Sequence, residues 1–234
     1  MSNILSKIYS PVINDYIEIN DDEYYSSFGL IKKNNAWKIK KKEKEKIEYA
    51  YRKAWENRDF EINKFWTRAA YFWGFIALIF VAYFKISENE IKNKYIQLII
   101  ICLGIIFSIA WNYVIRGSKK WQENWENHID KLEDFISGPL YKTIFHKDTF
   151  YSVSKINEIL SIVIIVVWLA MLINFLNLNS FFSLNNNSIT SFDFKILFTL
   201  IITFLFSISI IFGYSKKKYN NKKNSFIRRD SFSK

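Results

Sequence analysis

Few side chains in this sequence could do acid–base or metal chemistry, and none stands in a recognisable motif. The two histidines, His128 and His146, lie in the segments WENH and FHKD, which lack the HExxH and Cys–His spacings of zinc sites. We expect His128 to be an interfacial residue rather than a ligand. The acidic run at residues 21–23 could hold a metal ion, but it is also typical of a solvated surface. There is no glycine-rich phosphate loop and no nucleophile elbow. The sequence therefore predicts no enzyme, no metal and no cofactor.

Small and polar residues instead recur at helical spacing inside long apolar runs. They are Gly104, Ser108 and Asn112 in one run, and Thr199, Thr203 and Ser207 in another. Such residues let helices approach closely and hydrogen-bond across the contact. Alternatively, copies of one stripe in an oligomer could line a pore. No ionisable residue lies at mid-depth, which argues against a charge-selective filter and against a transporter.

The elements that carry these residues are long enough to cross a bilayer. A spanning helix needs about 20 apolar residues, and four segments meet this requirement: residues 65–84, 95–115, 158–178 and 194–214. Only six glycines and two prolines occur, which favours long helices over a loop-rich β protein. The predicted fold is all-α, a four-helix transmembrane protein. A buried helix of a soluble core is the alternative, but four such runs in 234 residues argue against it.

The distribution of lysine and arginine predicts the orientation of the spans. The two termini and the connection 116–157 carry 28 basic residues, whereas the connections 85–94 and 179–193 carry 3. Cytoplasmic loops are enriched in Lys and Arg. We therefore expect a multi-pass protein with both termini in the cytoplasm. Abundant Lys, Asn and Ile, and no visible signal peptide, favour a bacterial inner membrane.

Charged helices are expected to extend the first two spans into the cytoplasm. Residues 42–64 have helical charge patterning and lead into the first span, after an N-terminal region at residues 1–41. After the second span, residues 116–118 (Arg-Gly-Ser) are expected to bend the chain. An amphipathic helix follows, with Trp121 and Trp125 on its apolar stripe. A short outer connection makes the spans antiparallel, so the two extensions can form a cytoplasmic helical bundle.

The junction between the first extension and its span contains an arginine. Trp66 lies where the sequence changes from polar to apolar, and Arg68 lies about one turn further in. The arginine could snorkel to the lipid phosphates. Alternatively, it could pair with a neighbouring helix or subunit and fix assembly.

The formal charge of +11 needs no nucleic-acid partner. Most of it follows from the asymmetry of the loops, and no nucleic-acid-binding motif accompanies it. The basic tail at residues 215–234 could bind anionic lipid at about 1 kcal/mol per basic residue. The expected partners are therefore the lipid bilayer and further copies of the chain, not nucleic acid.

Two segments resemble the RipA family of octameric bacterial inner-membrane proteins. The resemblance lies in Arg58, Phe60 and Glu61, the Phe65–Trp66 and Phe72–Trp73 pairs, and the helix of Trp121 and Trp125 before residues 152–157. It implies a homo-oligomeric ring, octameric, without enzymatic activity. With His128, the residues expected at assembly interfaces are Arg58, Glu61, Trp66, Arg68, Trp73, Trp121 and Trp125.

Two functions fit these features. The first is a homo-oligomeric, non-enzymatic scaffold or signalling platform that faces the cytoplasm. The alternative is an oligomeric gated pore or a membrane-permeabilising defence effector.

Overall fold

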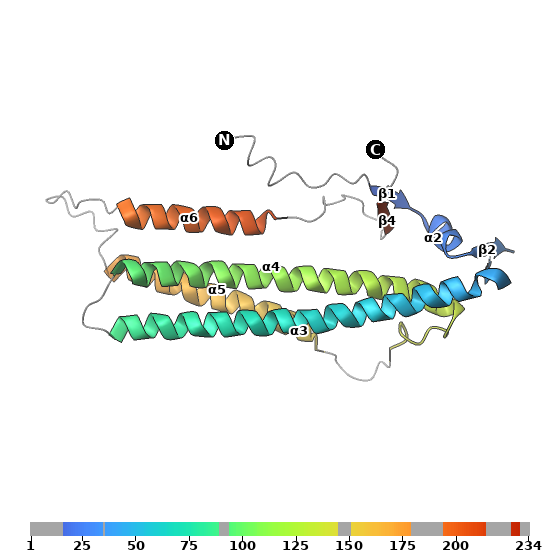
Figure 1. The fold of residues 1–234 in the computed structure, drawn as a ribbon, viewed down its shortest axis with the longest axis horizontal. Coiled ribbons are helices and arrows are strands. Elements are labelled where there is room, and N and C mark those ends of the chain that lie inside the picture. The colour runs from blue at the N-terminus through green and yellow to red at the C-terminus, as the bar shows by residue number, and fades with distance from the viewer. Residues whose placement is uncertain are drawn as a thin grey trace. The chain divides into compact units, whose positions relative to one another are not determined.

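Four long helices make up most of the chain. The computed structural model describes residues 16–34, 36–88, 94–144, 151–178, 194–213 and 226–229. The long helices are α3 (Lys44–Glu88), α4 (Lys94–Leu132), α5 (Val153–Leu178) and α6 (Phe194–Ile211) (Figure 1). The short elements are β1 (Tyr16–Ile19), α2 (Asp21–Ser27), β2 (Leu30–Lys33), β3 (Ala36–Ile39), β4 (Phe226–Arg229) and the 3-10 turns η1 (Lys41–Glu43) and η2 (Glu133–Phe135).

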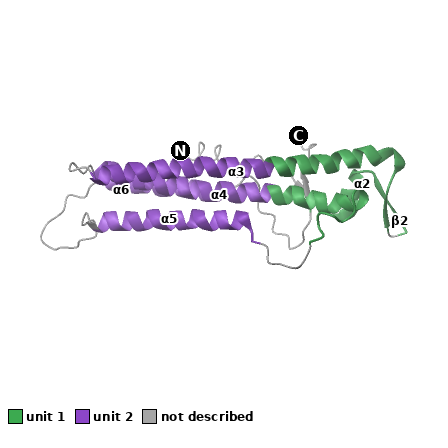
Figure 2. Ribbon diagram, turned by 90° about the horizontal axis from the view of Figure 1, so that it is seen from below, with its two compact units in different colours: residues 1–60, 122–147, 213–234 green, residues 61–121, 148–212 purple. Residues whose placement is uncertain are grey.

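The chain divides into two compact units (Figure 2). Unit 1 comprises residues 1–60, 122–147 and 213–234, and unit 2 comprises residues 61–121 and 148–212. Helices α3 and α4 contribute residues to both units, so the predicted extension of the first two spans into a further helical pair is present.

Unit 2 contains the predicted spans. Four helices of the described chain are long and apolar enough to cross a membrane, which confirms the all-α, four-helix transmembrane fold. Helix α4 is central among them, because 50% of its most apolar stretch is buried within the chain, against 11% for α3 and 6% for α6. The other three helices therefore pack against α4 and leave most of their own apolar surface uncovered.

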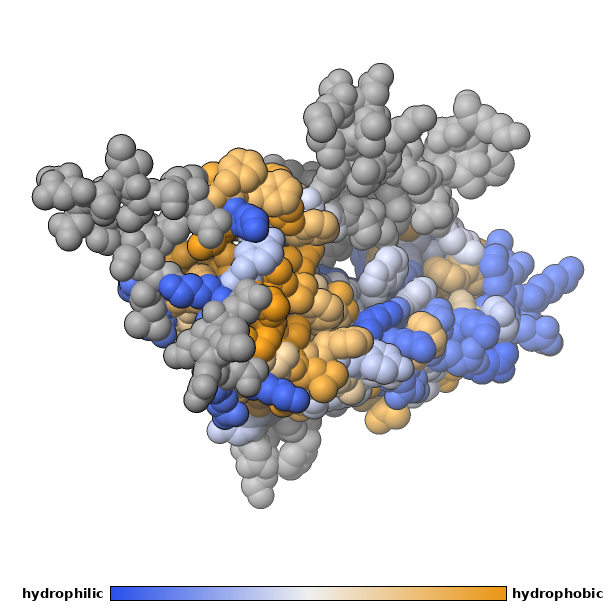
Figure 3. Space-filling model, turned by 60° about the vertical axis from the view of Figure 1, so that its left-hand side comes forward, coloured by the Kyte–Doolittle hydropathy of each residue, from blue (hydrophilic) through white to orange (hydrophobic). Residues whose placement is uncertain are grey.

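Apolar side chains gather over the spans of unit 2 on the face shown in Figure 3. Large exposed hydrophobic residues occur on α3, α5 and α6, among them Leu78, Val81, Val163, Val166, Phe204 and Phe206. A water-soluble protein rarely exposes such continuous apolar surface, whereas hydrocarbon or a neighbouring subunit covers it at no cost.

Helix α4 corrects one expectation. The Arg116-Gly117-Ser118 segment was expected to bend the chain, but α4 continues through it as one helix of 39 residues. A single glycine in a helix costs only about 1 kcal/mol relative to alanine. Side-chain contacts of Ser118, which is buried, help to offset that cost.

Unit 1 contains short strands that the sequence analysis did not anticipate. Strands β2 and β3 pair antiparallel, with Leu30 opposite Ile39, and β1 pairs antiparallel with β4, with Tyr16 opposite Arg229. The β2–β3 hairpin turns at Asn34, whose φ of 48° suits asparagine. The all-α class holds for the bulk of the chain, and these four-residue strands are additions to it.

The core of unit 1 forms where α2 and the hairpin pack on α3 and α4. Its buried members are Tyr24, Leu30, Ile47 and Leu132. Asn20 caps α2 in a capping box with Glu23, which fixes the helix start.

Several expectations concern residues outside the described part of the chain. These are the residues 1–15, the connection 179–193, His146 and most of the basic tail.

Candidate functional site

Arg68 joins α3 to α4 at one end of the spans in unit 2. Its guanidinium donates to Glu61 Oε2 at 3.3 Å and to the hydroxyl of Ser118 on α4. Glu61 and Arg68 lie seven residues apart, which places them on the same face of the helix. The structure thus brings together two of the expected interface residues, and it adds a partner on the neighbouring helix.

A second polar layer joins α4 to α5 close to the same level. Arg116 Nε lies 3.2 Å from Glu158 Oε1, and Asn112 Nδ2 donates to Ser161 Oγ at 2.7 Å. Asn112 and Ser161 are buried, so their hydrogen bond lies in an environment of low dielectric constant, where it is strengthened. Helix α4 is therefore bonded to both α3 and α5 near the end where Arg68 and Arg116 lie.

Arg58 forms a separate cluster in unit 1. The guanidinium lies over the rings of Trp55 and Tyr141, each at 5.3 Å, and Nε donates to Tyr141 Oη at 3.1 Å. Glu126 Oε1 lies 3.6 Å from Arg58 Nε. Burial opposes the charge, but the hydrogen bond to Tyr141 and the nearby Glu126 raise the pKa of Arg58 above its ordinary value. This arrangement ties α3 to α4 in unit 1.

His128 and Trp125 belong to the aromatic cluster of unit 1. His128 Nδ1 lies 2.7 Å from the hydroxyl of Tyr24, and its ring packs against Trp125 and against Phe226 of β4. Burial lowers the pKa of His128 to about 4, so the imidazole is neutral at physiological pH. Burial also raises the pKa of Tyr24. No group of three metal-ligating side chains occurs among the described residues.

The acidic run at residues 21–23 is used in local structure. Asp21 pairs with Lys131 and Asp22 pairs with Lys32, while Glu23 completes the cap of α2. Each carboxylate therefore has a cation or a backbone N–H as partner.

The remaining expected tryptophans do not form one cluster. Trp66, Trp73 and Trp121 each expose about two fifths of their surface. Trp66 contacts Phe65 edge-on, and Trp73 contacts Trp111 of α4 edge-on, with 6.4 Å between ring centroids.

The small and polar residues of the spans are engaged within one chain. A Cβ at Gly104 would overlap the indole of Trp168 on α5, and Ser108 Oγ donates to the Gly104 carbonyl. Thr199, Thr203 and Ser207 each donate to the carbonyl four residues earlier in α6, and Thr203 and Ser207 are buried.

Sequence reasoning missed Glu133, which is wholly buried in unit 1. Its carboxylate accepts from the backbone N–H groups of Tyr141, at 2.7 Å, and Lys142, at 3.1 Å. It therefore folds the segment after α4 back onto the helix. A signal was present: Glu133 follows Ile129 by four residues, so it lies on the apolar stripe of that helix.

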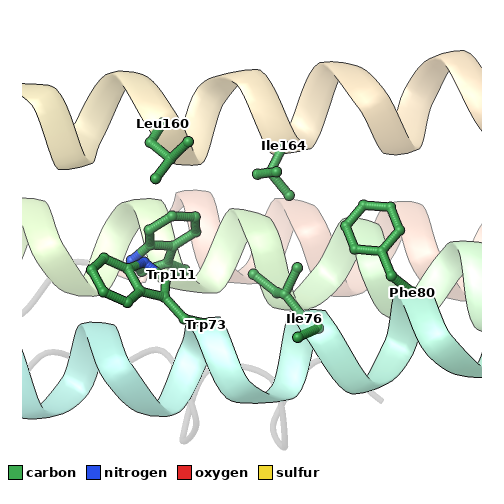
Figure 4. Close-up of a pocket in the computed structure, with 7 residues that line it drawn as sticks. Trp73, Ile76, Phe80, Trp111, Leu160 and Ile164 are labelled. Atoms are coloured by element: carbon green, nitrogen blue, oxygen red, sulfur yellow. The ribbon is translucent and has the colours of Figure 1, made fainter.

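The spans enclose a pocket of about 320 Å³ between α3, α4 and α5 in unit 2 (Figure 4). We call it the α3–α5 pocket. Leu160 and Ile164 of α5 point toward α3, and Trp73, Ile76 and Phe80 of α3 point toward α5. Trp111 of α4 lies between them, and Ala77 completes the lining.

Comparison with known proteins decides the family. The model of the octameric membrane protein family (8xMP) matches residues 48–177, which is more than half of the chain. The chain belongs to the octameric membrane protein family. The matched range contains Arg58, Arg68, Glu133 and the α3–α5 pocket, whereas α6 with its hydroxyl residues lies beyond it. No curated protein and no solved structure matched the chain.

Proposed function

We propose that the chain assembles into a homo-octamer of the RipA type in the bacterial inner membrane, where it is a non-enzymatic scaffold or signalling platform. Both termini and unit 1 face the cytoplasm in this proposal. The observation that carries it is the membership of the octameric family, together with the uncovered apolar faces of α3, α5 and α6. A single chain leaves these faces for lipid and for neighbouring copies.

We favour a scaffold over a pore because of the way α6 packs. Thr203 and Ser207 are buried within one chain, while Phe204, Leu205 and Phe206 are exposed. If copies meet through the exposed face of α6, they present phenylalanine and leucine to the axis rather than hydroxyl groups. A hydrated path needs polar groups or a wide lumen.

The scaffold role rests on unit 1. Its aromatic core and the Arg58 cluster hold the extensions of α3 and α4 together beyond the spans. Eight such units at one membrane surface would repeat the same binding face for a cytoplasmic protein. The basic tail could add contacts with anionic lipid near the surface.

The mass of the complex in mild detergent tests the assembly directly. We expect eight times the 28.1 kDa chain mass after correction for detergent. A monodisperse monomer or dimer under conditions that keep the chain folded would refute the octamer.

Cysteine labelling tests the orientation. Cys102 is buried, so an impermeant maleimide should leave the wild type unlabelled in intact cells. A cysteine introduced at Ser188 should react from outside the inner membrane, and one at Ser231 should react only after lysis. The reverse pattern would refute the cytoplasmic orientation.

For the choice between platform and pore, we expect no current from the reconstituted octamer in planar bilayers. Reproducible single-channel steps that disappear in a Thr199→Leu, Thr203→Leu, Ser207→Leu variant would favour the pore.

A further inference from the structure

The α3–α5 pocket contains one polar group that the rest of the chain does not satisfy. Trp111 is 1% exposed, and its Nε1–H has no hydrogen-bond acceptor among the residues that the structure describes. A buried N–H without an acceptor is costly, most of all in hydrocarbon, where water cannot replace the missing bond. The pocket therefore favours an occupant that brings an acceptor to this point.

Charged, donor and apolar groups follow one another along this part of unit 2. Arg68 precedes Trp73 by five residues on α3, and Arg116 follows Trp111 by five residues on α4. At 1.5 Å per residue, each arginine lies about 7.5 Å along the helix from its tryptophan. The hydrogen bond of Arg68 to Ser118, two residues after Arg116, places both arginines near one level. On the other side of the tryptophans, the pocket continues with apolar side chains only.

A glycerophospholipid has the same order of groups: an anionic phosphate, ester carbonyls that accept hydrogen bonds, and an acyl chain. We propose that the α3–α5 pocket binds one acyl chain of a phospholipid. The ester carbonyl of that chain accepts the Trp111 N–H, and the phosphate lies at the level of Arg68 and Arg116. The pocket volume of about 320 Å³ is at the small end for ligand sites, which suits one chain rather than a whole lipid.

The rim of the pocket also fits a lipid. Trp73 and Leu160, on the two sides, are 43% and 44% exposed, so the pocket opens sideways, toward the position of the bilayer. A second copy of the chain is the competing occupant. The large side chains exposed on α6 are phenylalanine, leucine and isoleucine, and these offer no acceptor to the indole. The lipid satisfies the N–H, and such a helix face does not. The proposal does not depend on the copy number of the complex.

A variant that fills the pocket tests occupancy. Ala77→Trp places a large ring in the pocket, whereas Ala170→Trp adds the same ring to an exposed position of α5 that does not line it. Native mass spectrometry of the full-length protein, purified with phosphatidylglycerol, counts bound lipid. We expect about one tightly held phospholipid per chain in the wild type and in Ala170→Trp, and loss of it in Ala77→Trp. Equal lipid counts in all three proteins would overturn the proposal, as would a lower copy number in Ala77→Trp with its lipid retained.

The hydrogen bond is tested separately, in a variant that keeps the pocket apolar. Trp111→Phe removes the N–H, and a mixture of ester-linked and ether-linked phosphatidylglycerol compares lipids with and without the carbonyl acceptor. We expect the wild type to prefer the ester lipid by about five-fold, as one hydrogen bond allows, and Trp111→Phe to show no preference. The same preference in both proteins, or none in the wild type, would overturn the assignment of Trp111.

Discussion

The contact between Gly104 and Trp168 offers the sharpest test of how α4 and α5 pack. A Cβ added at Gly104 would lie 2.7 Å from Trp168 Cζ2 and closer still to two other atoms of the indole. Trp168 cannot easily retreat, because it is wholly buried and stacks on Phe80 with 4.2 Å between ring centroids. Gly104→Ala should therefore force a shift of the helix or of the ring.

The magnitude follows from two opposing contributions. Overpacking a filled core costs about 1–3 kcal/mol, whereas replacing glycine by alanine in a helix gains about 0.5–1 kcal/mol. Gly74→Ala is a matched control, because nothing lies within 4 Å of its added Cβ. We expect Gly74→Ala to be neutral or slightly stabilising and Gly104→Ala to be less stable than the control by about 1–3 kcal/mol.

Denaturant unfolding of both variants in the same mild detergent measures this difference. Trp168→Phe in the Gly104→Ala background supplies a second check, since the smaller ring should recover part of the loss. If Gly104→Ala were as stable as Gly74→Ala, the close approach of α4 and α5 at this position would be wrong.

Three further predictions concern the polar contacts. Glu133→Ala should lower the free energy of unfolding by about 2–3 kcal/mol, because two backbone N–H groups lose their acceptor; the exposed control Glu45→Ala should change it little, and equal losses would contradict the role of Glu133. Because the pKa of His128 is lowered to about 4 in the folded state, the unfolded chain binds more protons between pH 6.5 and 4. The stability of unit 1 should therefore fall by up to about 3 kcal/mol over this range and should stay flat above it; His128→Phe should remove the slope, and an unchanged slope would point to other groups. Arg68→Leu should weaken the oligomer in mild detergent while insertion persists, because Glu61 loses its cation and Ser118 its donor; an unchanged elution volume would argue against a part in assembly.

Hydropathy and charge patterning were sufficient to predict the spans. Their apolar runs exceed the thickness of a bilayer, and no soluble fold of this size buries four of them. The extension of α3 and α4 beyond the spans was also predictable, because helical charge patterning continues there without a strong helix breaker. Gly117 was given too much weight as a bend, since the burial of Ser118 holds α4 in one piece.

The candidate site was harder to predict, because its contacts depend on tertiary neighbours. Arg68 and Glu61 could be paired by their spacing on one helix, but Ser118 and Ser161 have no local sequence signal that indicates their partners. The pairing of β1 with β4 joins segments about two hundred residues apart, and each strand has only four residues. No periodicity of two can be recognised over so short a stretch.

The arrangement of unit 2 limits how copies of the chain can meet within the membrane. Helix α4 is enclosed by its own chain, and the polar groups near the span ends are bonded within that chain: Arg68 to Ser118, Arg116 to Glu158 and Asn112 to Ser161. The surfaces left for contact in the bilayer are the apolar faces of α3, α5 and α6, on which lipid competes with protein on nearly equal terms. Van der Waals complementarity alone gives little orientational specificity there. The copy number and the geometry of the ring must therefore be set largely by the parts of the chain outside the hydrocarbon, where water makes apolar burial favourable and charged contacts selective.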